Sequence, residues 1–302
     1  MKKVLITGAR GFIGRHCLPS LLAANFDEVH AVSSQVAIKI DGDVRWHQAD
    51  LLDNLQASKL LSKVKPTHLL HFAWYAKPGE YWTSPENRRW LVASQKLLAE
   101  FAAQGGARFV GAGTCAEYDW SYGILSERKT PLAPQSVYGE NKRALQQTLN
   151  AEGKRLGIST AWGRIFFLYG PHEYPQRLVS SVILSLLHDE PALCTLGRQR
   201  RDFLHVQDVA DAFVALLQSD VTGPVNIASG EAVMVKEIVE RIAHKLDRER
   251  LLRLGARPLS PNEPPLLVAD VARLKDEVGW YPRYGLERGL EQTISWWRTS
   301  GE

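Results

Sequence analysis

Tyr138 and Lys142 are the two residues whose types and spacing most directly suggest acid–base chemistry. They stand four positions apart in the stretch from Pro134 to Lys142, at the opening of a helical pattern with apolar positions at Leu145 and Leu149. Both side chains therefore project from one face of a helix. A phenol with a pKa of about 10 is a poor acid or base at neutral pH, but an ammonium group within a few Å favours the phenolate and lowers that pKa. The spacing indicates an acid–base tyrosine with a lysine beside it, although the same spacing also occurs on ordinary helices.

The beginning of the chain has the pattern of a dinucleotide-binding turn. An apolar run over residues 2–7 predicts a buried strand, which leads into Gly-Ala-Arg-Gly-Phe-Ile-Gly at positions 8–14 and a helical pattern that continues to Leu22. Glycines here permit a tight turn and close backbone approach, so the helix N-terminus can face a pyrophosphate. The residues expected to bind a nicotinamide dinucleotide are Gly8, Arg10, Gly11, Phe12, Ile13 and Gly14.

The end of the second expected strand, residues 29–33, bears on the choice of dinucleotide. In NAD-binding proteins an acidic residue here usually bonds the ribose 2′-hydroxyl, but this strand ends in Ser33-Ser34. The lack of Asp or Glu removes repulsion toward a 2′-phosphate, and Arg10 in the glycine turn offers a cation for it. We therefore expect NADP, with NAD as the alternative, and contacts of the cofactor with Arg10 and Ser33. Arg10 could instead only cover the turn from outside.

Further strands and helices alternate through the first half of the chain. Strands are expected over residues 43–49, 67–73 and 108–113, and helices over 55–64 and 85–104, which implies a parallel sheet covered on both sides. Ligands of such sheets bind at the C-terminal ends of the strands. This rule selects Asp50, Ala73, Trp74 and Thr114, together with the aromatic loop over residues 75–78. Trp74 is expected to contact the substrate, and the Thr114 hydroxyl could bond a substrate carbonyl.

The predicted fold is α/β, a Rossmann-type doubly wound parallel sheet with a smaller C-terminal α/β substrate lobe. After residue 171 the alternation loosens and prolines become frequent. We therefore assign residues 1–170 to an NAD(P)-binding domain and residues 171–302 to a substrate-binding lobe that is interleaved with it.

The helix expected over residues 85–104 has an apolar stripe wide enough to contact more than one neighbour. Its apolar positions are Trp90, Leu91, Ala93, Leu97, Leu98 and Phe101. A helix buried on two sides suggests a homodimer, formed through this helix and the one over residues 138–150.

Composition narrows the class of protein. A net charge of +4 over 302 residues gives no reason to expect nucleic acid as a partner. Cys17, Cys115 and Cys194 have neither metal nor disulfide spacing, which fits a reducing, cytoplasmic compartment. No segment approaches the roughly 18 uninterrupted apolar residues of a membrane span. We expect a protein that is neither exported nor embedded in a membrane, without a metal site.

Taken in order, the motifs resemble those of the extended short-chain dehydrogenase/reductase family, which includes nucleotide-sugar epimerases, dehydratases and reductases. The resemblance begins with the glycine turn, Asp50-Leu51, His71-Phe72-Ala73, Thr114 four residues before Tyr118, and the segment from Tyr138 to Lys142. It continues past the sheet with residues 164–171, 199–210, 224–230 and 278–280 and Gly289-Leu290. The resemblance thus covers nearly the whole chain.

The resemblance implies roles for individual residues. Tyr138 would be the proton donor or acceptor for a sugar hydroxyl or ketone, and Thr114 would bond the same oxygen. Lys142 would hold the nicotinamide ribose and lower the Tyr138 pKa. Asp50 would bond the adenine amine, with Leu51 and Ala73 nearby in the cofactor site.

Two arginines are implied in substrate binding. Arg201 would meet the diphosphate of a nucleoside-diphosphate sugar, and Arg257 is a looser match to a second arginine of this kind. A planar guanidinium suits phosphate oxygens on physical grounds as well. A surface pair between Arg201 and its neighbour Asp202 is the alternative.

Two departures from the family pattern matter. Phe167 stands where many relatives have an Asn that helps to anchor the nucleotide-sugar. Cys115 and Ala116 follow Thr114, whereas 4,6-dehydratases have Asp and Glu there, so water elimination has no acid–base pair.

Three functions are compatible with these residues. The first is an NADP-dependent reductase of a 4-keto-(6-deoxy)hexose on a nucleoside diphosphate, in which hydride goes to C4 while Tyr138 protonates the oxygen. The second is a nucleotide-sugar 4-epimerase with retained NAD, which needs the same protein groups. The third is an inactive dinucleotide sensor, but such a protein has no need of Thr114, Tyr138 and Lys142 together. The end of the second strand favours the reductase.

Overall fold

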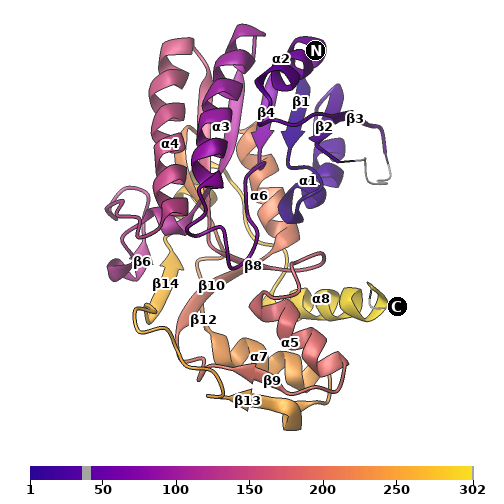
Figure 1. Ribbon diagram of the computed structural model, residues 1–302, viewed down its shortest axis with the longest axis vertical. Coiled ribbons are helices and arrows are strands. Elements are labelled where there is room, and N and C mark those ends of the chain that lie inside the picture. Colours follow the sequence, from indigo (N-terminus) through magenta and orange to yellow (C-terminus); the bar gives the residue numbers. More distant parts are fainter. Residues whose placement is uncertain (36–41, 301–302) are drawn as a thin grey trace.

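A parallel sheet of seven strands forms the larger part of the protein, in the computed structural model that describes residues 1–35 and 42–300 (Figure 1). Its strand order is β11-β7-β5-β4-β1-β2-β3, and each neighbouring pair is parallel. The strands are β1 (Lys3–Thr7), β2 (Glu28–Ser33), β3 (Val44–Gln48), β4 (His68–His71), β5 (Arg108–Thr114), β7 (Ser159–Ile165) and β11 (Gly223–Ile227). The predicted Rossmann-type α/β fold is confirmed.

Helices cover both faces of this sheet. One face is packed by α1 (Phe12–Ala23) and α6 (Val206–Gln218), and the other by α2 (Asn54–Val64), α3 (Glu86–Ala103) and α4 (Val137–Leu156) (Figure 1). The core is therefore divided by the sheet into two apolar clusters, as a doubly wound fold requires.

Two predicted element bounds differ for local reasons. The strand expected over residues 67–73 ends at His71, because the N–H groups of Phe72 and Ala73 donate to the Thr7 hydroxyl. The helix that contains Tyr138 continues to Leu156 and ends at Gly157, whose φ of 70° is the left-handed conformation that glycine adopts most readily.

The smaller part of the protein lies at the other end of the long axis (Figure 1). Its second sheet contains β12 (Ala232–Met234), β10 (Arg200–His205), β14 (Leu266–Ala269), β6 (Ile124–Leu125) and β8 (Phe167–Tyr169). Its other elements are α5 (Leu178–Leu187), α7 (Val235–Lys245), α8 (Leu286–Ser300) and the strand pair β9 (Ala192–Cys194) and β13 (Leu252–Leu254). These helices pack around a third apolar cluster.

The chain after residue 171 does not stay in the smaller part. Helix α6 packs on α1, and β11 extends the first sheet beside β7. Between the two helices, Ser20 Oγ donates to Asp211 Oδ1 at 2.5 Å. Residues 206–227 therefore belong spatially with the first sheet, while the division into domains at residue 170 stays a prediction.

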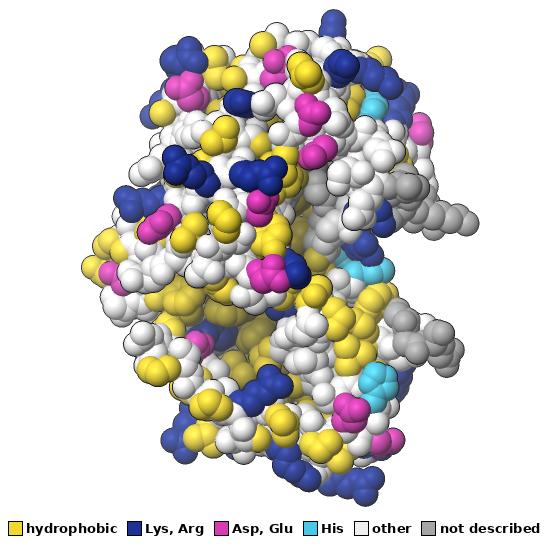
Figure 2. Space-filling view, in the orientation of Figure 1, with side chains coloured by type: hydrophobic (Ala, Val, Ile, Leu, Met, Phe, Trp, Pro, Cys, Tyr) yellow, Lys and Arg dark blue, Asp and Glu magenta, His cyan; other side chains and the backbone are white. Residues whose placement is uncertain are grey.

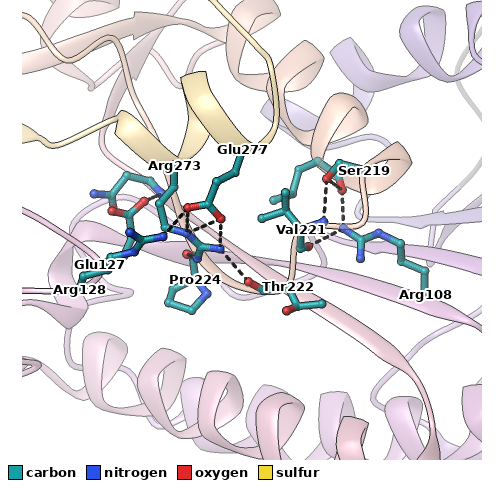
Figure 3. Close-up of polar contacts among 11 residues, drawn as sticks. Arg108, Glu127, Arg128, Ser219, Val221, Thr222, Pro224, Arg273 and Glu277 are labelled. Atoms are coloured by element: carbon teal, nitrogen blue, oxygen red, sulfur yellow. Dashed lines mark hydrogen bonds and ion pairs between the residues drawn. The ribbon is translucent and has the colours of Figure 1, made fainter.

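Two arginines form hydrogen bonds with the segment that leads into β11 (Figure 3). Arg108 Nη2 donates to the carbonyls of Leu216 and Val221, at 2.5 and 2.9 Å. Arg273 donates to the carbonyls of Thr222 and Pro224 and pairs with Glu277 at 2.7 Å. Arg108 precedes β11 in the sequence and Arg273 follows it. Residues on both sides of this strand in the chain therefore hold the segment that leads into it.

A hollow lies between the two parts, and hydrophobic side chains gather around it (Figure 2). Strand β4 ends toward the smaller part, and β5 runs parallel to it (Figure 1). The hollow is thus the region where a ligand of the sheet is expected.

In residues 1–35 and 42–300, no helix is long and apolar enough to cross a membrane.

Candidate active site

The turn between β1 and α1 has space only for glycine at key positions. Gly8 has φ of +65°, and a Cβ there would stand 2.9 Å from the Ala73 backbone nitrogen. A Cβ on Gly14 would stand 2.2 Å from the Gly8 carbonyl oxygen. Gly11 is the N-cap of α1 and provides no side chain to cap the helix. The backbone N–H groups of the first turn can therefore face an anion, and the residues present fit a dinucleotide pyrophosphate.

The remaining residues predicted for cofactor binding in this region are Phe12, Ile13, Asp50 and Leu51. Phe12 and Ile13 are half-buried in the first turn of α1, and Leu51 is buried. Asp50 is exposed at the end of β3, where its Oδ1 accepts the N–H of Leu52 at 2.9 Å. The second oxygen of this carboxylate has no protein partner among the described residues, which leaves it available to an amine.

Arg10 lies beside the end of β2. Its Nη1 donates to Gln35 Oε1 at 2.8 Å, and the Gln35 N–H donates to Ser33 Oγ at 3.0 Å. The structure therefore brings Arg10 and Ser33 together, while their contact with a cofactor stays a prediction. Gln35 joins them and was not singled out from the sequence.

Tyr138 and Thr114 meet at the ends of α4 and β5. Ser136 caps α4 by accepting the Gly139 N–H at 3.1 Å, which places Tyr138 in the first turn. Burial raises the pKa of Tyr138, mainly by disfavouring the phenolate, and the nearby Thr114 side chain opposes that rise.

Lys142 lies one turn along α4 but does not perform the predicted pKa tuning within the protein alone. Its Nζ is 5.8 Å from the Tyr138 ring centroid, donates to the Ala112 carbonyl at 2.9 Å, and lies 3.9 Å from the Trp74 ring centroid. Burial lowers the pKa of Lys142 to about 7. The expected lowering of the Tyr138 pKa is wrong for these side chains, because burial of the phenol outweighs a cation at this distance.

Glu117 organises the site from behind. It is fully buried, and its oxygens accept the Thr114 N–H, the Trp162 indole N–H and Arg164 Nε at 2.9, 2.9 and 2.8 Å. The carboxylate thus fixes the backbone of Thr114 and is not free for chemistry. Its position in the sequence, three residues after Thr114, fits a capping box, a signal that could have identified it.

The loop between β4 and α3 places aromatic rings on the acid–base group. The Tyr81 and Trp82 rings meet the Tyr138 ring edge to face at centroid distances of 4.9 and 5.8 Å. The Tyr138 N–H donates to the Trp82 carbonyl at 3.1 Å. The sequence pointed to the aromatic content of residues 75–78 but missed these two residues, which lie beyond that segment.

Arg201 is buried rather than exposed. It is 2% exposed, donates to the carbonyls of Arg200 and Pro264, and pairs with Glu263. Its guanidinium carbon lies 5.4 Å from the Phe167 ring centroid. The strands β8 and β10 pair directly, which explains why Phe167 and Arg201 are neighbours.

Asp202 does not pair with Arg201. Its carboxylate accepts the N–H groups of Ser229, Gly230 and Ala269 at 2.8, 2.9 and 3.1 Å. The alternative of a surface Arg201–Asp202 pair is therefore wrong.

Arg257 lies beside the strand pair β9–β13. It is exposed, and its N–H donates to the Cys194 carbonyl at 3.1 Å. The structure does not join it to Arg201 by any contact within the described residues, and its role in substrate binding stays a prediction.

The chain matches known proteins along nearly all of its length. Residues 4–228 match the model of the NAD dependent epimerase/dehydratase family. Among curated proteins, it is 28% identical to UDP-glucuronic acid decarboxylase 1 of Xenopus tropicalis, covering 98% of this chain and 72% of that protein. It is 25% identical to UDP-glucose 4-epimerase of Rhizobium meliloti, covering 97% and 96%.

Solved structures give the same result. The structure of MoeE5 in complex with UDP-glucose and NAD superposes with a TM-score of 0.87 at 30% identity, covering 99% of this chain and 100% of that one. Two findings agree. The chain contains the glycine turn, the strand order and the Thr114–Tyr138–Lys142 set, and one family model matches most of its residues. This protein belongs to the NAD dependent epimerase/dehydratase family, the extended short-chain dehydrogenases/reductases.

Proposed function

We propose that the protein is an NADP-dependent reductase of a 4-keto-6-deoxyhexose carried on a nucleoside diphosphate. The observation that carries the proposal is the position of Tyr138 in the first turn of α4, near Thr114 at the end of β5, with Lys142 one turn away on the same helix. A bound nicotinamide dinucleotide supplies the hydride. Tyr138 gives its proton to the substrate oxygen, and Thr114 bonds that oxygen and aims it.

The neighbourhood of Thr114 speaks against water elimination. Cys115 and Ala116 occupy the positions of the dehydratase acid–base pair, and burial raises the pKa of the Cys115 thiol to about 12. Glu117 cannot substitute for that pair, since its oxygens are committed to Thr114, Trp162 and Arg164. Oxidation or reduction at C4 needs no further carboxylic acid.

The surroundings of Tyr138 support a substrate with an apolar C6 group. Trp82 is half-buried and packs on the Tyr138 ring, so a C6 methyl group of a substrate at Tyr138 could pack against this indole, and burial of a methyl group against such a ring stabilises binding. A hydroxymethyl group placed there would need a hydrogen-bond partner to offset its loss of water.

A 4-epimerase is the second candidate, and the likeness to known proteins favours it. MoeE5 was solved with UDP-glucose and NAD and also with UDP-glucuronic acid and NAD, each at 30% identity to this chain. In an epimerase, Tyr138 would take the proton of the C4 hydroxyl and later return it to the same oxygen, while the hydride would leave C4 to the nicotinamide and return to the opposite face of that carbon.

The deciding experiment measures whether the protein oxidises NADPH or NADH when a 4-keto sugar substrate is present. The purified protein is incubated with NADPH or NADH and a nucleoside-diphosphate 4-keto-6-deoxyglucose, and absorbance at 340 nm is followed while the sugar product is identified by NMR. We expect stoichiometric oxidation of NADPH and little with NADH. Tightly retained NAD, together with interconversion of UDP-glucose or UDP-glucuronic acid and their 4-epimers without net change in absorbance, would establish the epimerase instead.

Arg10 is the residue we expect to select NADP. Since its guanidinium lies at the end of β2 beside Gln35 and Ser33, Arg10→Ala should weaken NADPH binding by about 1.5–3 kcal/mol, roughly 10- to 150-fold. NADH binding should change little, and Arg45→Ala, which removes an arginine paired with Glu28 on the sheet edge, should change neither. Titration of nucleotide fluorescence measures all three. Equal weakening of both nucleotides would place Arg10 on the shared pyrophosphate or in the fold.

A further inference from the structure

Trp74 has two contacts that together define its orientation. Its indole N–H donates to Asn87 Oδ1 at 2.8 Å, and its ring centroid lies 3.9 Å from Lys142 Nζ. The sequence predicts Trp74 as a substrate contact, but the structure shows that the polar edge of its ring is already bonded and that one face covers the lysine.

Asn87 holds Trp74 in this orientation. It lies fully buried at the start of α3, and its Nδ2 donates to the carbonyls of Tyr81 and Ser84 at 2.7 and 2.9 Å. One side chain therefore fixes both the indole and the loop that carries Tyr81. An amide with this set of partners has its donors and acceptor in use, so its rotamer is determined.

Lys142 is a charge with few polar partners. It is 4% exposed, and its only protein hydrogen bond among the described residues is to the Ala112 carbonyl. The ionisable groups that face it are Tyr138 on its own helix, Glu117 behind β5, and His71 at the end of β4. Of these, Glu117 favours the charged lysine, while burial disfavours it and dominates.

The face of an aromatic ring can stabilise a buried ammonium group that has few polar partners. The negative face of an indole attracts a cation, and this attraction is largest when the pair is shielded from water. The distance of 3.9 Å from Trp74 is the shortest of the three rings around Lys142 Nζ, since those of Tyr138 and Trp162 are at 5.8 and 5.7 Å.

We propose that Trp74 is a positioning residue for Lys142: its ring, oriented by Asn87, keeps the lysine protonated and pointed toward the site that the nicotinamide ribose would occupy. The inference deepens the role of Lys142 in the proposed function. Its test does not require catalysis, so the two can fail separately.

The direct test is a titration of Lys142 itself. Protein labelled with ¹³C-lysine is titrated by NMR through the Lys142 ¹³Cε shift, which is assigned with Lys142→Met. Trp74→Leu should lower the pKa of Lys142 by about one unit or more, as expected for loss of a shielded cation–π contact. Trp74→Phe, which keeps a ring, should recover part of the change. Asn87→Leu, which frees the indole, should shift the pKa in the same direction as Trp74→Leu.

Two controls make the outcome decisive. Trp296→Leu removes a half-buried tryptophan of α8 and should leave the Lys142 pKa unchanged. Thermal unfolding monitored by circular dichroism identifies variants that do not fold, in which case Trp74→Phe and Trp74→Tyr alone are compared with the parent. If Trp74→Leu leaves the Lys142 pKa unchanged or raises it, the ring acts only by excluding water and the proposal is overturned.

The pH dependence of the reaction provides a second test of the role of Trp74. If Lys142 must be protonated, the basic limb of the kcat/KM profile should move to lower pH in Trp74→Leu by the same amount as the NMR pKa. A uniform loss of activity with no shift of the limb would show a merely structural role and would overturn the proposal.

Discussion

Tyr138 packs against the rings of Tyr81 and Trp82, and burial of its phenol raises the pKa of this group. At neutral pH the side chain therefore carries its proton. That is the state required of a group that donates to a ketone, whereas a group that must first remove a proton works from the phenolate. The protonated phenol supports the proposed role of Tyr138 as a proton donor.

Tyr138→Phe tests this role. The ring packing is retained and the phenol is lost, so turnover should fall by about 10²–10⁴-fold, the usual contribution of general acid catalysis, while NADPH binding stays near normal. Steady-state kinetics and nucleotide titration measure the two effects. Tyr174→Phe, which changes an exposed tyrosine, serves as the control and should alter neither turnover nor NADPH binding. A loss of less than tenfold in Tyr138→Phe would remove this residue from the role of proton donor.

At the scale of elements, α3 and α4 lie side by side on one face of the sheet (Figure 1). Gln95 Nε2 on α3 donates to Thr148 Oγ1 on α4 at 2.9 Å, and Val92 on α3 is 45% exposed. We propose that these two helices form the interface of a homodimer, since an exposed valine beside a buried stripe is explained by a second copy that covers it.

Val92→Glu tests the proposed dimer. A carboxylate buried in an apolar contact loses its hydration, so the dimer dissociation constant should rise by at least about tenfold. Sedimentation velocity over a concentration series measures it. Leu55→Glu, at an exposed position on α2, should leave the association unchanged. If the parent protein is a monomer at high concentration, the α3–α4 interface does not exist.

The whole molecule shows which parts of such a site are predictable from sequence. The glycine turn and the Tyr138–Lys142 pair were predictable because each is encoded within a few residues of continuous chain. Glu263 as the partner of Arg201, and Asn87 as the anchor of Trp74, were not. Their contacts join residues that are distant in sequence or that depend on how a loop folds back, and no local period records them.

The pKa of Tyr138 illustrates the same limit. The spacing of Tyr138 and Lys142 correctly places both on one helix face, but the pKa depends on how many atoms surround the phenol. That depends on the loop after β4, whose path the sequence did not reveal. Motifs therefore predicted which residues lie near one another in the candidate site better than they predicted the pKa values of these residues.

The return of the chain to the first sheet constrains how relatives of this protein can exchange parts. A chimera with a single crossover at residue 170 would combine α6 and β11 of one parent with α1 and β7 of the other. It would separate pairs such as Ser20 with Asp211, and Arg108 with the carbonyls of Leu216 and Val221. A chimera that exchanges the smaller part therefore has to be a discontinuous graft, in which residues 206–227 come from the same parent as the first sheet and Arg273 is matched to the strand that it contacts.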